Sequence, residues 1–159
     1  MTNSMNPKIK FIGLILLVLC SCSGSHYDKS FTIDNESWGV SDILQFKVDI
    51  YDQTSRYNAL VHIRNTTDYS YSNIFMFVHV LYPDNTEKID TVEGYITDNK
   101  GTWLGSGSGR YKSNDFVYKR NILFPMRGTY IFTIEHAMRE ESLDGIATVG
   151  MEVIKLKPE

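Results

Sequence analysis

The chain has 159 residues, of which 42% are hydrophobic and 22% are charged, and its formal net charge is −3. A chain of this length is expected to form one domain that buries most of its apolar surface on folding. The acidic balance argues against nucleic-acid binding, which depends on clustered cations, and against electrostatic attachment to anionic lipids.

The N-terminus has the pattern of a secretory signal. Lys8 and Lys10 form a basic region, and an almost unbroken apolar run follows over residues 11–19. That run is shorter than the roughly 20 apolar residues that span a bilayer. It therefore predicts a cleaved signal peptide rather than a transmembrane helix.

The end of this signal resembles a lipobox, the cleavage and lipidation site of bacterial lipoproteins. Leu19 stands at −3 and the small Ser21 at −1 relative to Cys22, whereas cleavage before Cys20 would place the bulky Leu19 at −1. We therefore expect lipidation of Cys22; the alternative is an ordinary signal peptide with incidental cysteines. Stable anchoring needs more than one acyl chain, which a lipobox cysteine carries.

These observations define the expected organisation. We predict a signal peptide at 1–21, a small, polar, lipidated tether at 22–29 and one folded domain at 30–159. Loss of the signal removes two lysines and no acidic residue, which leaves 14 basic against 19 acidic side chains and a net charge of −5. No free thiol would remain, so the domain's stability must come from its core.

In chain order, the rest of the sequence predicts short strands separated by turns. Apolar and polar residues alternate over 44–50, as in a half-buried strand. Over 57–65, Ala59, Val61 and Ile63 share one face, and His62 and Arg64 lie on the other. Residues 73–82 are apolar on both faces, which predicts a central strand or one whose outer face is covered. Further strands are expected at 88–96, 116–124, 129–137 and 149–157, and residues 135–143 also allow a helical turn.

Strands at this spacing predict an all-β fold, a single antiparallel β-sandwich that is immunoglobulin-like or jelly-roll-like. One local pattern favours the immunoglobulin-like form. Tyr130 stands two residues before the apolar Phe132, and in such domains a tyrosine at this position bonds back to the chain at a corner.

The sequence shows no motif for catalysis or metal binding. No two of the histidines have metal-ligand spacing. Gly105–Gly109 has the letters of a nucleophile elbow, but it lies in a predicted loop without the strand-turn-helix context. We expect a non-enzymatic protein with no metal and no cofactor beyond the lipid on Cys22. A hydrolase with unrecognised carboxylates is the remaining enzymatic alternative. Separately, Asp90-Thr91-Val92 resembles a short O-glycosylation motif of exported Bacteroidetes proteins, which makes Thr91 a candidate attachment residue.

Five stretches together point to a family. They are YNALVHIRN at 57–65, DYSYSNIF at 68–75, GTWLGSG at 101–107, YKRNILFP at 118–125 and HAMR at 136–139. In this order they resemble the gliding motility lipoprotein GldH family of Bacteroidetes, over nearly all of the predicted domain. The resemblance implies an envelope lipoprotein associated with the gliding apparatus and, through it, with type IX secretion. It brings no catalytic residues.

The quoted loops are rich in aromatic and polar residues, which protein-binding patches use as anchors. We expect one patch formed by Arg64, Tyr69, Tyr71, Trp103 and Leu104. The alternative is a glycan-binding lipoprotein of an outer-membrane polysaccharide-uptake system, in which an exposed Trp38 or Trp103 would contact the sugar.

The residues around Cys22 also indicate a location. Ser23 follows Cys22, where an aspartate would retain the protein in the inner membrane, and no acidic run typical of surface lipoproteins follows. We therefore expect an outer-membrane lipoprotein on the periplasmic face, held by its lipid and bound to envelope proteins.

Overall fold

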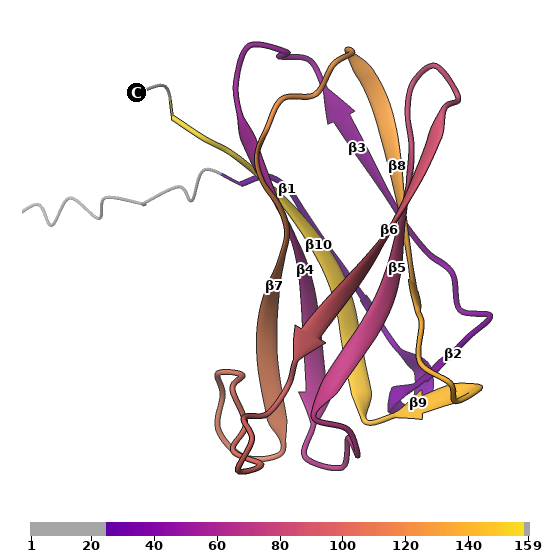
Figure 1. Cartoon of the computed structure of the whole chain (residues 1–159), viewed down its shortest axis with the longest axis vertical. Helices are drawn as coiled ribbons and strands as arrows, with labels where there is room; N and C mark the ends of the chain where they lie inside the picture. Colours follow the sequence, from indigo (N-terminus) through magenta and orange to yellow (C-terminus); the bar gives the residue numbers. More distant parts are fainter. Residues whose placement is uncertain (1–24, 158–159) are drawn as a thin grey trace, which may run out of the picture.

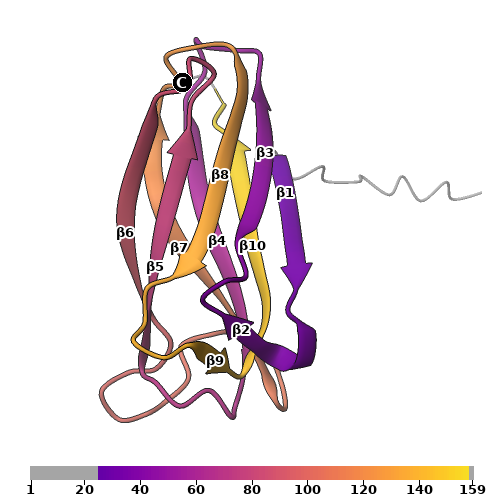
Figure 2. The ribbon, with the colours of Figure 1, turned by 90° about the vertical axis from the view of Figure 1, so that its right-hand side faces the viewer.

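Two four-stranded antiparallel sheets pack face to face over residues 25–157, the part of the chain that the computed structural model describes (Figure 1; Figure 2). The first, called here the β1–β7 sheet, has the order β1-β10-β4-β7. Its strands are β1 (Ser25–Thr32), β10 (Ile146–Lys155), β4 (Tyr57–Thr66) and β7 (Tyr111–Ile122). The second, called the β3–β6 sheet, has the order β3-β8-β5-β6. Its strands are β3 (Leu44–Ile50), β8 (Gly128–His136), β5 (Asn73–Leu81) and β6 (Glu87–Tyr95).

A short ribbon lies at one end of the sandwich. In it, β2 (Ser37–Gly39) pairs with β9 (Ser142–Asp144), and the 3-10 turn η1 (Asp34–Glu36) precedes β2. The loops 67–72 and 96–110 lie at the same end (Figure 1). This end, formed by residues 34–39, 67–72, 96–110 and 137–145, is called the loop end below.

The strand pairing is that of a jelly roll. β1 pairs with β10, β3 with β8, β4 with β7 and β5 with β6, all antiparallel. Apart from the ribbon strands, the first strand thus pairs with the last and the second with the second-last. The chain is one long hairpin rolled into two sheets, which is jelly-roll topology. Of the two sandwich types that the sequence allows, the jelly roll is the one present.

The core lies between the sheets and follows the expected alternation. In β3, Phe46, Val48 and Ile50 are fully buried, whereas the residues between them are exposed. β4 repeats the pattern with Tyr57, Ala59, Val61 and Ile63, and β10 adds Val149, Met151 and Val153. The predicted all-β sandwich is confirmed.

The tyrosine corner forms as predicted, although the topology is that of a jelly roll. The hydroxyl of the fully buried Tyr130 donates to the carbonyl of Met126 at 3.1 Å and accepts from its N–H at 3.2 Å. Phe132, two residues later, is 2% exposed and packs in the core. The corner therefore ties the turn before β8 to the interior.

Three expectations need correction. Residues 25–29, assigned to the tether, belong to β1, where Tyr27 and Phe31 pack against the core. The small polar residues of this segment hid the strand, since only every second side chain turns inward. β7 begins at residue 111 rather than 116. No helical turn forms over 135–143; the chain leaves β8 at residue 136 and enters β9 at 142. Cys22 and the signal peptide lie outside the described residues.

The direction of β1 places the start of the domain away from the loop end. Ser25 pairs with Ile154, near the end of β10, whereas Thr32 pairs with Thr148, near its beginning. β1 then leads directly into η1 and β2 at the loop end (Figure 2). Within residues 25–157, no helix has the length and apolar character to cross a membrane.

Candidate partner-binding end of the sandwich

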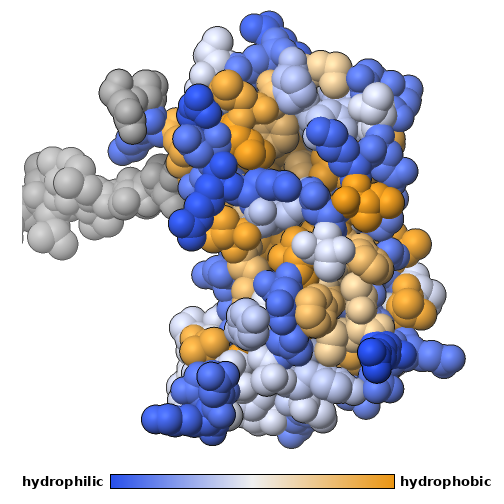
Figure 3. Space-filling model, viewed as in Figure 1, coloured by the Kyte–Doolittle hydropathy of each residue, from blue (hydrophilic) through white to orange (hydrophobic). Residues whose placement is uncertain are grey.

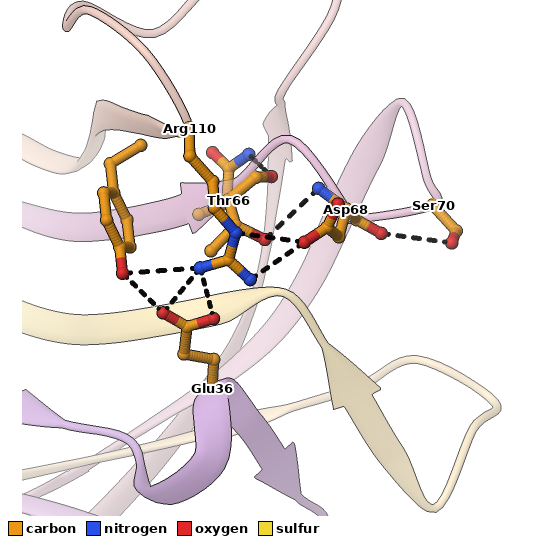
Figure 4. A network of polar contacts seen from close by, with 7 residues as sticks. Glu36, Thr66, Asp68, Ser70 and Arg110 are labelled. Atoms are coloured by element: carbon orange, nitrogen blue, oxygen red, sulfur yellow. Dashed lines mark hydrogen bonds and ion pairs between the residues drawn. The ribbon is translucent and has the colours of Figure 1, made fainter.

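A polar network centred on Arg110 joins three segments of the loop end (Figure 4). Nη1 of Arg110 lies 2.6 Å from Oε2 of Glu36, and Nε and Nη2 of Arg110 donate to Oδ2 of Asp68 at 3.1 and 2.8 Å. The hydroxyl of Tyr111 donates to Oε1 of Glu36 at 2.7 Å. The bonds from Tyr111 and Arg110 hold the pKa of the Glu36 carboxyl below its usual range. Arg110 and Asp68 are exposed, so these ion pairs contribute little to the free energy of folding. Their main effect is to fix the relative positions of the loops.

A buried amide pair supports the loop 96–110 from beneath. Nδ2 of Asn114 donates to Oδ1 of Asn65 at 2.8 Å, and Nδ2 of Asn65 donates to the Thr66 carbonyl at 2.8 Å. Both side chains are buried, so these bonds avoid the penalty for unpaired polar groups. Gly105 lies directly over the pair: a Cβ there would come within 2.7 Å of Oδ1 of Asn114.

Tyr69 and Tyr71 differ in role. Tyr69 is only 4% exposed, and its hydroxyl donates to the Asn73 carbonyl at 2.9 Å. Burial raises the pKa of this phenol. Its ring packs edge-on against that of Tyr71 at 5.7 Å between centroids, and Tyr71, 37% exposed, donates to Oε1 of Glu140 at 2.8 Å. Tyr69 is thus a support inside the domain rather than a contact residue, whereas Tyr71 is displayed.

The same division holds in the loop 96–110. Trp103 is half-buried, forms a β-bridge with Thr97 and packs against the core. Leu104 donates its N–H to the Ile96 carbonyl at 2.9 Å, while its side chain is 57% exposed. The indole therefore anchors the loop and the leucine faces solvent.

Arg64 lies on the outer face of the β1–β7 sheet, with its guanidinium 4.5 Å from the ring centroid of Tyr111. Tyr71 lies on the other side, beside Phe75 of β5 and Met138 of the segment that follows β8. The five predicted residues thus gather at one end of the sandwich but on two sides of it, and they do not form the single surface that we expected.

The structure also bears on the glycan-binding alternative and on the glycosylation motif at Thr91. Trp38 is fully buried and donates its indole N–H to the Asp42 carbonyl at 3.1 Å. Neither tryptophan therefore offers the exposed indole platform that the glycan-binding alternative requires. Thr91 is exposed on β6, but the Asp90 carboxylate turns inward and bonds to Tyr118 at 2.6 Å. The folded strand displays the threonine of the glycosylation motif, whereas its aspartate, 39% exposed, is engaged by Tyr118 and Lys119.

Sequence reasoning missed the polar network. Glu36 and Arg110 are 74 positions apart, and no local pattern marks them as partners. Gly107 and Gly109 lie just before Arg110, and glycines at this spacing are typical of turns. They were the local signal that this segment has a defined shape. Across residues 25–157, no group of three or more His, Cys, Asp or Glu side chains is arranged to hold a metal ion.

The fold and its loop end define an all-β jelly-roll domain in which buried and polar contacts hold aromatic-rich loops in place. The family model for the GldH lipoprotein matches residues 25–153, which is almost the whole described domain. The chain therefore belongs to the GldH lipoprotein family.

Two relatives match over nearly their full lengths. The chain is 33% identical over 154 residues to the gliding motility lipoprotein GldH homolog of Christiangramia forsetii, covering 91% of this chain and 94% of the relative. It is 29% identical over 156 residues to the gliding motility lipoprotein GldH of Flavobacterium johnsoniae, covering 92% and 97%. Among solved structures, the infectious bursal disease virus VP2 subviral particle aligns with a TM-score of 0.40 and 15% identity. That alignment covers 93% of this chain but 37% of the viral one, and nothing about function follows from it.

Proposed function

We propose that this protein is a non-enzymatic accessory lipoprotein, anchored through a lipid on Cys22, that binds envelope proteins of the gliding or type IX secretion machinery through its loop end. Membership of a gliding-motility lipoprotein family supports its association with the cell envelope. The lipobox pattern supports the anchor on Cys22. Ser23 after Cys22 supports the outer membrane, and the lack of an acidic run in the residues that follow supports its periplasmic face.

The observation that carries the proposal is the separation between the start of the domain and the loop end. Ser25 follows Cys22 by three positions and begins β1, whose eight residues run toward the loop end. At roughly 3.3 Å per residue, β1 spans about 25 Å. A lipid on Cys22 would hold one end of the sandwich at the membrane and direct the loops away from it.

Leu104 and Tyr71 are the contact residues that we propose at this end. They are 57% and 37% exposed, and both stand on segments fixed by backbone and side-chain hydrogen bonds. A preformed surface loses little conformational entropy on binding, which favours affinity for a given contact area. Arg64 lies on the opposite side and would contact a partner that wraps around the end.

The test is a crosslinked pull-down with the tagged, full-length chain in its own cell envelope, with Cys22→Ala as the comparison. We expect gliding or type IX secretion components with the wild type and their loss with Cys22→Ala. Equal recovery from the unlipidated variant would contradict the role of the anchor. Recovery of outer-membrane glycan importers in place of those components would contradict the proposed machinery. Fractionation and protease protection of the same cells test the outer membrane and its periplasmic face.

A further inference from the structure

The outer face of β5 is unusually apolar for a strand that faces solvent. Inward, Ile74, Met76, Val78 and Val80 are buried in the core. Outward, the same strand presents Phe75, Phe77, His79 and Leu81. Antiparallel sheets with one solvated face normally place polar residues there. The two-sided apolar pattern of residues 73–82 is therefore only half explained by the core.

Neighbouring strands extend this surface. Ile89 of β6 pairs with His79 and is 59% exposed, and Ile131 of β8 pairs with Leu81. Phe77, at the centre, is 37% exposed. We call this surface the β5 face, formed by Phe75, Phe77, Leu81, Ile89 and Ile131. None of the described elements lies over it (Figure 2). Contiguous exposed apolar surface of this kind marks interaction sites.

The charges around the β5 face are mainly acidic. The outward positions of β5, β6 and β8 include Glu87, Glu93 and Glu135 and no lysine or arginine. The cations at its border are Lys47 of β3, which pairs with Ile131, and Arg139 beside the pocket described next. His79 stands between two of these carboxylates, with Nδ1 3.3 Å from Glu87 and Nε2 3.1 Å from Glu135. An acidic frame repels an anionic lipid surface, and it also disfavours a second copy, since a two-fold contact would bring the same carboxylates together. It attracts cationic groups.

A pocket at the loop-end side of the β5 face indicates the size of the group that binds there. It has a volume of about 250 Å³ and is lined by Tyr71, Phe75, Ala137, Met138, Arg139 and Glu140. The N–H of Phe75 donates to the sulfur of Met138 at 3.3 Å, which fixes one wall. A cavity of about 150 Å³ holds a benzene molecule, whereas whole small-molecule sites measure roughly 300–1,000 Å³. The pocket therefore fits one large side chain better than a complete metabolite.

We propose that the β5 face is a docking surface for a partner protein segment in which apolar residues, one of them an anchor for the pocket beside Met138, are flanked by lysine or arginine. The inference rests on the proposed role as a partner-binding lipoprotein and names a surface and a partner chemistry for it. Phe77 and Ile89 form the apolar centre of the contact. Glu87 and Glu135 meet the partner's cations.

Site-specific photo-crosslinking in the full-length chain, in its own envelope, tests this surface. The crosslinker replaces Ile89 on the β5 face, Val117 on the outer face of the β1–β7 sheet (41% exposed), or Leu104 at the loop end. We expect a discrete protein adduct from Ile89 and little from Val117. Mass spectrometry of the adduct should read a segment of apolar residues flanked by lysine or arginine.

Charge reversal provides the matched comparison. Glu87→Lys alters a 54% exposed carboxylate beside His79, and Asp115→Lys alters a 66% exposed one beside His62 on the other sheet. We expect Glu87→Lys to lower the Ile89 adduct about tenfold, as loss of a strong interface contact does, and Asp115→Lys to leave it unchanged. Unchanged thermal unfolding of both variants, with Glu87→Gln as a milder third, shows that the fold persists.

The remaining outcomes separate the two proposals. Adducts from Leu104 but none from Ile89 would overturn the β5 face and leave the accessory role standing. Protein adducts from neither position would overturn both. An adduct with a second copy of the chain, with lipid, or with a segment lacking cationic residues would overturn the partner chemistry. A glycan on Thr91, which pairs with Phe77, would cover the face and also overturn it.

Discussion

The hydroxyl of Tyr118 donates a 2.6 Å hydrogen bond to the carboxylate of Asp90, and so joins β7 of one sheet to β6 of the other. Nζ of Lys119 lies 3.1 Å from the same carboxylate oxygen. Beside this contact a cleft of about 250 Å³ opens between the two strands, with Val80, Phe124 and Phe132 among its lining residues. Apolar atoms gather in a hollow in the upper half of this side (Figure 3). The Tyr118–Asp90 bond is therefore a clamp across an otherwise open edge of the sandwich.

Removal of this clamp should destabilise the domain. Tyr118→Phe deletes the donor and leaves the half-buried ring in place. A hydrogen bond to a charged acceptor contributes roughly 1.5–3 kcal/mol, and the exposure of Asp90 reduces this to about 1 kcal/mol. Urea unfolding at neutral pH measures the change, with Tyr95→Phe, at a 60% exposed tyrosine of β6, as the control. Equal midpoints for the two variants would show that the clamp contributes nothing.

The same bond predicts how the stability of the domain changes at acid pH. Tyr118, more than Lys119, holds the pKa of the Asp90 carboxyl below its usual range. A depressed carboxyl pKa adds stability above the unfolded value, near about 4, and that stability is lost as pH falls through the folded pKa. Tyr118→Phe should therefore lose less stability than the wild type when the pH falls below about 4. Parallel pH profiles of the two proteins would contradict this assignment.

His136 should make the domain sensitive to mild acid. It is 2% exposed, packs edge-on against Trp38 at 5.4 Å between centroids, and burial lowers its pKa. The unfolded chain then takes up a proton that the folded chain refuses, so stability falls as pH drops below about 6.5. His136→Phe keeps an aromatic ring and should flatten this part of the profile in thermal unfolding between pH 7 and 5. If the unfolding temperature of His136→Phe falls with pH as steeply as that of the wild type, His136 is not the group responsible.

Gly105 should tolerate no side chain. A Cβ would meet Oδ1 of Asn114 at 2.7 Å, and this amide cannot move without breaking its 2.8 Å bond to Asn65. Overpacking of this kind costs about 1–3 kcal/mol. Gly105→Ala should lower the unfolding free energy by that amount, while Ser106→Ala, at an exposed neighbour in the same loop, should not. If the two variants unfold alike, the loop is not held against the amide pair.

The sequence predicted the parts of the fold that local periodicity encodes. β3 alternates strictly, and β4 does so apart from Leu60 and its last residues, so most of their inward residues could be named in advance. The corner at Tyr130 was predicted from a local pattern, the tyrosine two residues before Phe132, and its partner Met126 is only four residues away. β1 was missed because Ser25, His26 and Asp28 read as a polar linker, and its pairing with β10 is a contact between the two ends of the domain.

The candidate site was predicted less completely, for a related reason. Composition identified the segments 64–71 and 103–109, although residues 64–66 belong to β4, but not which of their aromatic residues turn inward. Tyr69 and Trp103 pack against the core, which depends on strands distant in sequence. The link from Glu36 to Arg110 depends on the jelly-roll topology that brings η1 beside the start of β7. The same topology places Arg64 and Tyr71 on opposite sides of the sandwich, and the sequence alone could not show this.

The central claim, that the loop end binds the partner, is tested most directly by the amount of partner recovered from two matched surface variants. Leu104→Asp charges a 57% exposed side chain at the loop end, and Tyr51→Asp charges a 70% exposed one at the opposite end. Both are made in the full-length, lipidated chain, and recovery in the crosslinked pull-down is normalised to the anchored protein. We expect Leu104→Asp to lower recovery about tenfold and Tyr51→Asp to match the wild type. Equal recovery from the two variants, or a loss confined to Tyr51→Asp, would contradict the account.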